Sequence, residues 1–240
     1  MISLFGKKNV VNAQEKDIFL VSYPKSGNTW LRFMVANLLA VEEVNFYNVH
    51  EYCPEFPSAE RKSNFYKGTV YKSHELYNPI FQRVVYLVRD PRDVYVSYYH
   101  YLKNKNNNVG SIANFIKSVP PKKQWDTHVS SWINAKMNRD EFLIIRYEDL
   151  KIDTFESFKK VVNFCNFDVT DHQISDSVGN SSFNSMKLIE RKHGRPNKTH
   201  TKDIFVRKGK VSQWENELGE TEINLIMQRC GKNMKRLGYE

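Results

Sequence analysis

Apolar residues fall in three short, nearly continuous runs, each closed by a polar or proline-containing junction. The runs lie in DIFLVSYP (17–24), QRVVYLVRDP (82–91) and EFLIIRYEDL (141–150). Runs of this length, rich in Val, Ile and Leu, are typical of strands buried on both faces of a parallel sheet. Helical spacing follows the first two runs. The pattern therefore predicts an α/β fold, in which a parallel sheet is flanked by helices on both faces.

Four stretches carry apolar residues at helical spacing. The first begins near Asn28, and the second has Asp90 as its expected N-cap with Pro91 at its first position. Two later stretches, 153–167 and 221–239, each keep one apolar face. Such a face is typical of a helix that packs on a core, so we assign no special chemistry to these two.

Two polar stretches, 103–111 and 191–203, are predicted to be surface loops. The second is strongly basic, so closing over a bound anion is an alternative role. The chain has no internal repeat, and its 240 residues suffice for one domain with a substantial core. Residues 1–240 are therefore expected to form a single domain.

Composition and charge narrow the class of partner. Hydrophobic residues make up 40% of the chain, as in a folded globular protein, and the net charge is +9. The positive charge favours an anionic ligand but does not choose among a nucleotide, a nucleic acid and a membrane surface. No apolar run approaches the roughly 20 residues of a membrane span, and no signal peptide is expected in the first residues.

The three cysteines are far apart and belong to no metal-binding motif. They are Cys53, Cys165 and Cys230, an odd number with no CxxC or Cys/His cluster. Neither a disulfide framework nor a zinc site is indicated. We therefore expect reduced, mostly buried thiols and a cytoplasmic protein.

The junction after the first predicted strand has the outline of a phosphate-binding loop. Strand, tight loop and helix follow one another in IFLVSYPKSGNTWLRFMVANLL (18–39). Backbone N–H groups at the start of such a helix favour a phosphate, and Gly27 allows close approach. In the NTP-binding pattern G-x-x-x-x-G-K-[ST], however, the lysine follows the last glycine. Here Ser22 holds the first position, and the only lysine, Lys25, precedes Gly27 by two residues.

The sequence also lacks a clear acidic ligand for a metal–nucleotide complex. Asp90 follows a hydrophobic strand, but it lies between Arg89 and Arg92 and fits a helix cap better. Metal-assisted phosphoryl transfer is therefore disfavoured. A sulfuryl group is transferred as a monoanion and needs less charge neutralisation, which lysines and a histidine can supply.

Six segments, in order, resemble the sulfotransferase family. YPKSGNTWL resembles its first cofactor segment, RVVYLVRDPRDVYVSYYHY the second and RKGKVSQWE the third. YKSHEL lies where the family carries its catalytic lysine and histidine, and RYEDL and SSFNSMK also match. The resemblance covers about residue 18 to the end. It implies a P-loop-like fold and an enzyme that uses 3′-phosphoadenosine-5′-phosphosulfate (PAPS), releases 3′,5′-bisphosphoadenosine (PAP) and needs no metal.

The resemblance also implies roles for individual residues. Catalysis would fall to His74 as general base, with Lys25 and Lys72 stabilising the leaving phosphate. The 5′-phosphosulfate and one side of the adenine would be bound by Lys25, Ser26, Gly27, Asn28, Thr29 and Trp30. The 3′-phosphate would be bound by Arg89, Ser97, Arg207, Lys208 and Gly209. The rest of the adenine pocket would come from Tyr147 and Phe183, with Ser182 close by.

These implied roles agree with the chemistry of the side chains. An arginine at a strand end offers a fork of donors that suits a phosphate. Neutral imidazole can accept a hydroxyl proton near neutral pH, so His74 would deprotonate the acceptor as its oxygen attacks sulfur in line. Glu75 is expected to face solvent, and His100, an alternative base, to be packed among aromatic residues.

The chain departs from the family pattern at two places. Asn28 stands where threonine is common, and Ser212-Gln213 stand where Gly-Asp commonly precedes the tryptophan. The first side chain can still form hydrogen bonds. The second difference leaves the path of that loop open.

Two other classes of function remain as alternatives. One is a Mg–NTP-dependent kinase or NTPase with an unusual P-loop, and the other is a non-catalytic module that binds a nucleotide or nucleic acid. Scattered rather than clustered charge argues against nucleic acid. The acceptor is expected to be a hydroxyl or amine of a small molecule, glycan or lipid. The sequence reveals neither its identity nor the oligomeric state, although the aromatic run 98–101 could shape its pocket.

Overall fold

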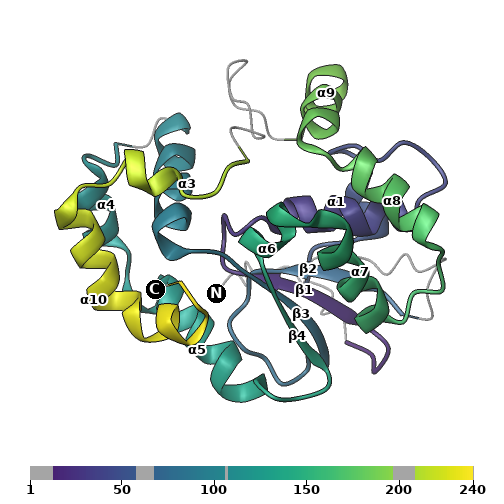
Figure 1. Cartoon of the computed structure of the whole chain (residues 1–240), viewed down its shortest axis with the longest axis horizontal. Helices are drawn as coiled ribbons and strands as arrows, with labels where there is room; N and C mark the ends of the chain where they lie inside the picture. Colours follow the sequence, from purple (N-terminus) through teal and green to yellow (C-terminus); the bar gives the residue numbers. More distant parts are fainter. Residues whose placement is uncertain (1–12, 58–67, 106–107, 197–208, 240) are drawn as a thin grey trace, which may run out of the picture.

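A computed structural model describes residues 13–57, 68–105, 108–196 and 209–239 of the chain (Figure 1). The elements in order are β1 Ile18–Ser22, α1 Asn28–Leu39, α2 Val49–Tyr52, β2 Val70–Ser73, β3 Arg83–Val88, α3 Pro91–Asn104, α4 Ile112–Ser118, η1 Pro121–Lys123, α5 Trp125–Lys136, β4 Phe142–Arg146, α6 Tyr147–Ile152, α7 Thr154–Cys165, α8 Asp171–Asn180, α9 Phe183–His193, η2 Gln213–Asn216 and α10 Glu220–Arg236.

The four strands form one parallel sheet in the order β2-β1-β3-β4. The three predicted strands are present, and β2 forms at the strand-like GTVYKS that precedes His74. The register pairs Ile18 with Val70 on one side and with Arg83 on the other. Because all four strands run the same way, their carboxyl ends lie at one edge of the sheet. The predicted α/β fold with a parallel sheet is confirmed.

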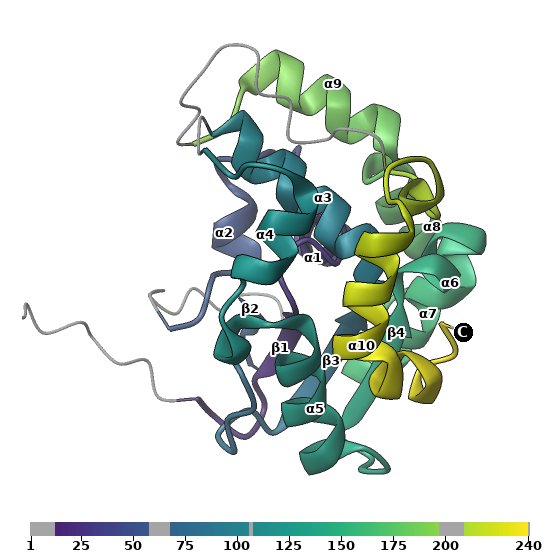
Figure 2. The ribbon, with the colours of Figure 1, turned by 90° about the vertical axis from the view of Figure 1, so that its left-hand side faces the viewer.

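Successive residues of each strand point to opposite faces of the sheet, and both faces are covered by helices. Phe19 and Val21 of β1 belong to a core shared with α3, α4, α5 and α10. Ile18 and Leu20 belong to a second core shared with α1, α7 and α8. Figure 1 shows these two groups of helices on opposite sides of the sheet, and the view of Figure 2 looks onto the α3, α4, α5 and α10 side.

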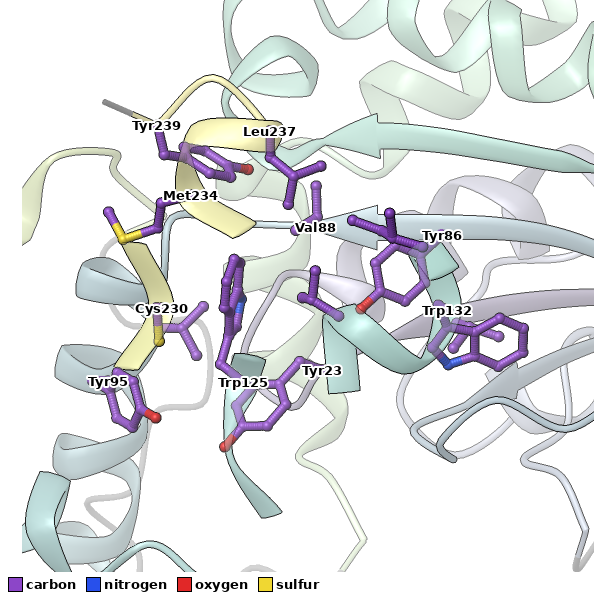
Figure 3. Packing of buried hydrophobic residues seen from close by; sticks show 14 of the residues in the cluster. Tyr23, Tyr86, Val88, Tyr95, Trp125, Trp132, Cys230, Met234, Leu237 and Tyr239 are labelled. Atoms are coloured by element: carbon purple, nitrogen blue, oxygen red, sulfur yellow. The ribbon is translucent and has the colours of Figure 1, made fainter. Parts of the chain in front are cut away.

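Large aromatic side chains fill the first core. Trp125 and Trp132 of α5 are fully buried, and Trp132 packs beside Tyr86 of β3 (Figure 3). Cys230 and Met234 of α10 close the other side of this core. This packing fixes α5 and α10 against the sheet.

Local sequence signals place several helix ends as predicted. The Asp90 carboxylate accepts a hydrogen bond from the backbone N–H of Arg92 at 2.8 Å, and Pro91 opens α3. The two predicted polar loops, in contrast, each begin inside a helix. α3 continues to Asn104 and α9 to His193, so 103–104 and 191–193 are not loop. Both helices hold basic residues in their last turn, which favours helix at that end.

The three cysteines are free and buried, as expected from their spacing. Burial raises the pKa of the Cys53 thiol to about 11, so this thiol is protonated and unreactive near neutral pH. In the described part of the chain, no helix combines the length and the apolar character needed to span a membrane. The cytoplasmic location and the single domain stay predictions.

Candidate active site

Each of the four strands is followed, within three positions of its end, by a residue that lines the same pocket. Lys25 follows β1, His74 follows β2, Arg89 follows β3 and Tyr147 follows β4, and all four line a pocket of about 450 Å³. This volume is within the range of pockets that hold small ligands and cofactors. The pocket therefore lies at the carboxyl edge of the sheet, where α/β folds bind their ligands.

The loop between β1 and α1 has a backbone that few residues adopt. Lys25 and Gly27 both have positive φ, 71° and 98°. A Cβ on Gly27 would lie 2.6 Å from Cδ2 of Tyr147, so only glycine fits between the loop and that ring. Gly27 is also the N-cap of α1 and offers no capping side chain. Backbone N–H groups at this helix start are therefore placed to bind an anion.

Asn28 anchors this loop to the sheet. Its Nδ2 donates to the backbone carbonyl of Leu20 at 2.9 Å and to Oγ of Ser22 at 3.1 Å. The side chain is buried, and its Oδ1 accepts no hydrogen bond from the described residues. The departure from threonine at this position thus supplies a link from helix to strand.

Arg89 is buried and held from several sides. Its Nη2 lies 3.1 Å from a carboxylate oxygen of Asp93 and donates to the backbone carbonyl of Lys210 at 2.9 Å. The guanidinium also lies 4.3 Å from the ring centroid of Tyr147. The other Asp93 oxygen accepts from the backbone N–H of Trp214 at 3.1 Å. These bonds join residues 210–214 to Arg89 and Asp93, which follow β3. Two segments that are far apart in the sequence therefore meet at Arg89.

Three aromatic side chains line another part of the same pocket: Trp30, Tyr147 and Phe183. The Trp30 and Tyr147 rings meet edge to face with centroids 5.8 Å apart, and Trp30 Nε1 donates to the carbonyl of Ser181 at 2.9 Å. Gly209, at φ 58°, passes so close to Phe183 that a Cβ would lie 2.8 Å from its ring. This end of the pocket presents fixed aromatic faces on which a flat base can stack.

His74 is held in one tautomer. Its Nδ1 lies 2.7 Å from the backbone carbonyl of Ser22. Because a carbonyl oxygen only accepts, Nδ1 must carry the proton and Nε2 must carry the lone pair. Burial, followed by the positive charge of Lys72, lowers the pKa of His74 to about 4. The ring is therefore neutral near pH 7, with a basic nitrogen available.

Lys72 lies two residues before His74 in the sequence and lines the pocket with it. Its Nζ is 2.6 Å from a carboxylate oxygen of Glu55, and its side chain is only 13% exposed. Lys25 also lines the pocket, acts on the charge of His74, and has its Nζ 4.3 Å from the ring centroid of Tyr101. Two lysines and one neutral histidine therefore share this part of the site.

Most of the predicted site residues come together. The pocket is lined by Lys25, Gly27, Asn28, Thr29, Trp30, Lys72, His74, Arg89, Ser97, Tyr147, Phe183 and Gly209. Ser26 and Ser182 do not line it. Ser26 is buried, and the Ser182 hydroxyl accepts from the backbone N–H of Ser185 as the N-cap of α9. Arg207 and Lys208 lie outside the described residues.

The structure also shows the surroundings of Glu75 and His100, the two side chains to which the sequence assigned no role in the site. Glu75 is exposed, as expected. His100 is half-buried in α3, and its Nε2 bonds to a carboxylate oxygen of Glu217, so this ring is paired rather than only packed.

Some residues of the site were not predicted. Lys151 and Met186 line the pocket, and Glu55 holds Lys72 from just outside it. Lys151 stands four positions after Tyr147 in the helical RYEDLK stretch, so helical spacing could have placed it on the same face. Nothing local marks Glu55, because its partner is 17 residues away.

Comparisons with known proteins agree with this geometry. The family described as "Sulfotransferase domain" matches residues 15–238. Human "Sulfotransferase 2B1" is 27% identical over 255 residues, which cover 95% of this chain and 68% of the relative. Rat "Sulfotransferase 2A6" is 28% identical over 239 residues, covering 87% and 82%. The crystal structure of mouse sulfotransferase SULT7A1 complexed with PAP superposes with a TM-score of 0.70 at 25% identity, covering 95% of this chain and 90% of that one.

Proposed function

This chain belongs to the sulfotransferase family, and from that premise we propose how its pocket transfers a sulfuryl group from PAPS to an acceptor. The chain is a PAPS-dependent sulfotransferase, and PAPS is its cosubstrate. The observation that carries this proposal is the convergence of all four strand ends on one pocket.

The cofactor binds across the carboxyl edge of the sheet. Its 5′-phosphosulfate lies on the loop from Lys25 to Thr29, where the helix start of α1 favours negative charge. Its adenine stacks among Trp30, Tyr147 and Phe183. Its 3′-phosphate lies by Arg89 and Ser97. Arg207, Lys208 and Gly209 are assigned to that phosphate from the family resemblance alone, and Ser26 and Ser182 act through the shape of their loops rather than through direct contact.

His74 is the general base. Its Nε2 removes the proton of the acceptor hydroxyl or amine while that atom attacks sulfur, and the bond from sulfur to the 5′-phosphate oxygen breaks on the opposite side. The proton ends on Nε2, and PAP leaves with the bonding electrons. The hydrogen bond from Nδ1 to Ser22 stabilises the imidazolium that forms.

The two lysines stabilise the charge that moves to the leaving group. Lys25 lies on the loop that holds the 5′-phosphate, and its ammonium stabilises the bridging oxygen as the bond breaks. Lys72 lies beside the base and binds the oxygens of the sulfuryl group in transit. Both assignments rest on their shared place in the pocket with His74.

The acceptor is a small molecule with a hydroxyl or amine group. It enters beside Tyr98 and Tyr101, which line the pocket from α3. These rings give an apolar wall that suits the carbon skeleton of such an acceptor. Incubating a panel of phenols, alcohols, sterols, amines and sugars with labelled PAPS, followed by mass spectrometry, identifies the acceptor class.

Thermal unfolding with and without nucleotide tests the cofactor assignment. PAP at about 100 times its dissociation constant adds roughly 2.7 kcal/mol to the free energy of unfolding. For a chain of this size, the midpoint should rise by roughly 5–11 °C. The rise should persist in EDTA, and Mg–ATP should give little. A larger rise with Mg–ATP than with PAP would refute the sulfotransferase assignment in favour of an NTP-dependent enzyme.

A further inference from the structure

We propose that Glu55 is a positioning residue that holds the Lys72 ammonium beside His74 and offsets its charge. This inference rests on the proposed roles of Lys72 and His74. Glu55 is exposed along about half of its side chain, whereas Lys72 is largely buried. A buried ammonium is costly unless it is paired, so the 2.6 Å contact with Glu55 makes this burial possible.

The backbone places Glu55 beside Lys72 independently of the charge of Glu55. Residues 54–56 run alongside β2 as a short extra edge: the N–H of Lys72 donates to the carbonyl of Pro54 at 2.8 Å, and the N–H of Phe56 donates to the carbonyl of Lys72 at 2.9 Å. Glu55 and Lys72 form an isolated parallel bridge between these hydrogen bonds. Their side chains therefore leave neighbouring backbones at the same height.

The pair governs how Lys72 can act. An ammonium has three donors. When one N–H bonds to Glu55, the position of the ammonium is fixed and the directions of its other two N–H groups are restricted. Lys72 lines the pocket in this orientation. Without the carboxylate, the four-carbon side chain of Lys72 is free to turn into solvent. The entropy lost when it is fixed again for catalysis then adds to the activation free energy.

The pair also sets the charge around His74. Among the described residues, Lys72 and Lys25 are cations that face the ring and favour its neutral form, whereas Glu55 favours the protonated form. His128 of α5 also faces it, and burial, followed by the influence of His74, lowers the pKa of His128 to about 4, so this ring adds no charge near pH 7. Glu55 is thus the nearby anion that keeps His74 from becoming too weak a base.

A double-mutant cycle tests this coupling. Glu55→Gln keeps the shape of the side chain but removes its charge, and it should lower kcat by about 10- to 100-fold, the loss typical of a hydrogen bond to a charged group. PAP affinity should not change. In a Lys72→Met background, the same Glu55→Gln change should lower kcat far less, since the positioning action passes through Lys72 and only the effect of the Glu55 charge on His74 remains. Glu55→Asp should recover part of the loss.

Glu75→Gln is the matched control. Glu75 is the residue directly after His74 in the sequence, and it is exposed. It is not among the groups that influence the pKa of the His74 ring. Its loss should leave kcat unchanged. Equal losses from Glu55→Gln with and without Lys72, or an equal loss from Glu75→Gln, would overturn the positioning role.

A measurement without turnover separates this inference from the proposed function. The pKa of His74, read by NMR of its ring, should rise in Lys72→Met and fall again in Lys72→Met/Glu55→Gln. If these changes occur in a protein that transfers no sulfuryl group, the charge coupling stands and the assigned reaction fails. If the second change leaves the pKa of His74 where Lys72→Met put it, the coupling is wrong even in an active enzyme.

Discussion

The two ends of the pocket differ in their electrostatics. We call the part formed by Lys25, Gly27–Trp30, Arg89, Tyr147 and Phe183 the nucleotide end. We call the part formed by His74 and Lys72, together with Glu55 just outside the pocket, the base end. The nucleotide end collects a helix start, a guanidinium and aromatic faces. The base end instead keeps a neutral imidazole next to an ammonium that is already paired.

Under the proposed roles, this difference follows from what each end binds. Phosphate and sulfate groups stay anionic throughout, so fixed donors and positive charge stabilise them at every stage. A general base must be able to gain a proton, so it needs to start neutral with its lone pair aimed outward. In the proposed role of His74, the Ser22 carbonyl meets this need, because it holds the proton of His74 on Nδ1. Mutations at the two ends should therefore separate chemistry from binding.

The largest effect is expected at the base end. His74→Asn removes the basic Nε2, and turnover should fall by about 10²–10⁴-fold while the dissociation constant of PAP stays unchanged. Single-turnover kinetics and calorimetric titration with PAP measure the two quantities. His100→Asn is the control and should retain turnover, because the His100 ring of α3 is hydrogen-bonded to Glu217 and does not line the pocket. Near-normal turnover in His74→Asn would exclude this residue as the base.

A loss of both properties is expected at the nucleotide end. Lys25→Met should lower turnover by about 10²–10³-fold, the usual result of losing one well-placed donor, and it should also weaken PAP binding. The same two measurements apply. Lys105→Met is the control, because its Nζ lies 4.7 Å from the centroid of the same Tyr101 ring but outside the residues that line the pocket. If both changes reduce turnover equally, general surface charge rather than Lys25 itself is responsible.

A smaller effect is expected from the loop backbone. Gly27→Ala places a Cβ 2.6 Å from Tyr147 at a positive φ, so it should lower the free energy of unfolding by roughly 1–3 kcal/mol and weaken PAP binding. Urea unfolding and calorimetry measure this. Gly179→Ala, in α8 with no atom within 4 Å of the added Cβ, should be neutral or stabilising by up to about 1 kcal/mol. Equal stability of Gly27→Ala and the parent would contradict the close fit.

The nucleotide end was the more predictable of the two. Its residues lie in contiguous motifs, and the turn after β1, the Asp90 cap and the strand that ends just before Arg89 all depend on neighbours within a few positions. The polar stretches were misjudged at their starts, because an adjoining helix extends into each one. A local composition signal cannot tell the last turn of a helix from the loop that follows.

The sequence by itself determined the strands, the helix-opening junctions and the types of side chain that could meet a sulfuryl donor, because periodicity and capping act over a few residues. Tertiary structure alone decided that four strand ends share one pocket, that Glu55 reaches Lys72, and that His74 is neutral with Nδ1 protonated. These features depend on pairs separated by 17 to 52 residues and on burial, which exist only once the sheet and its two helical layers have assembled.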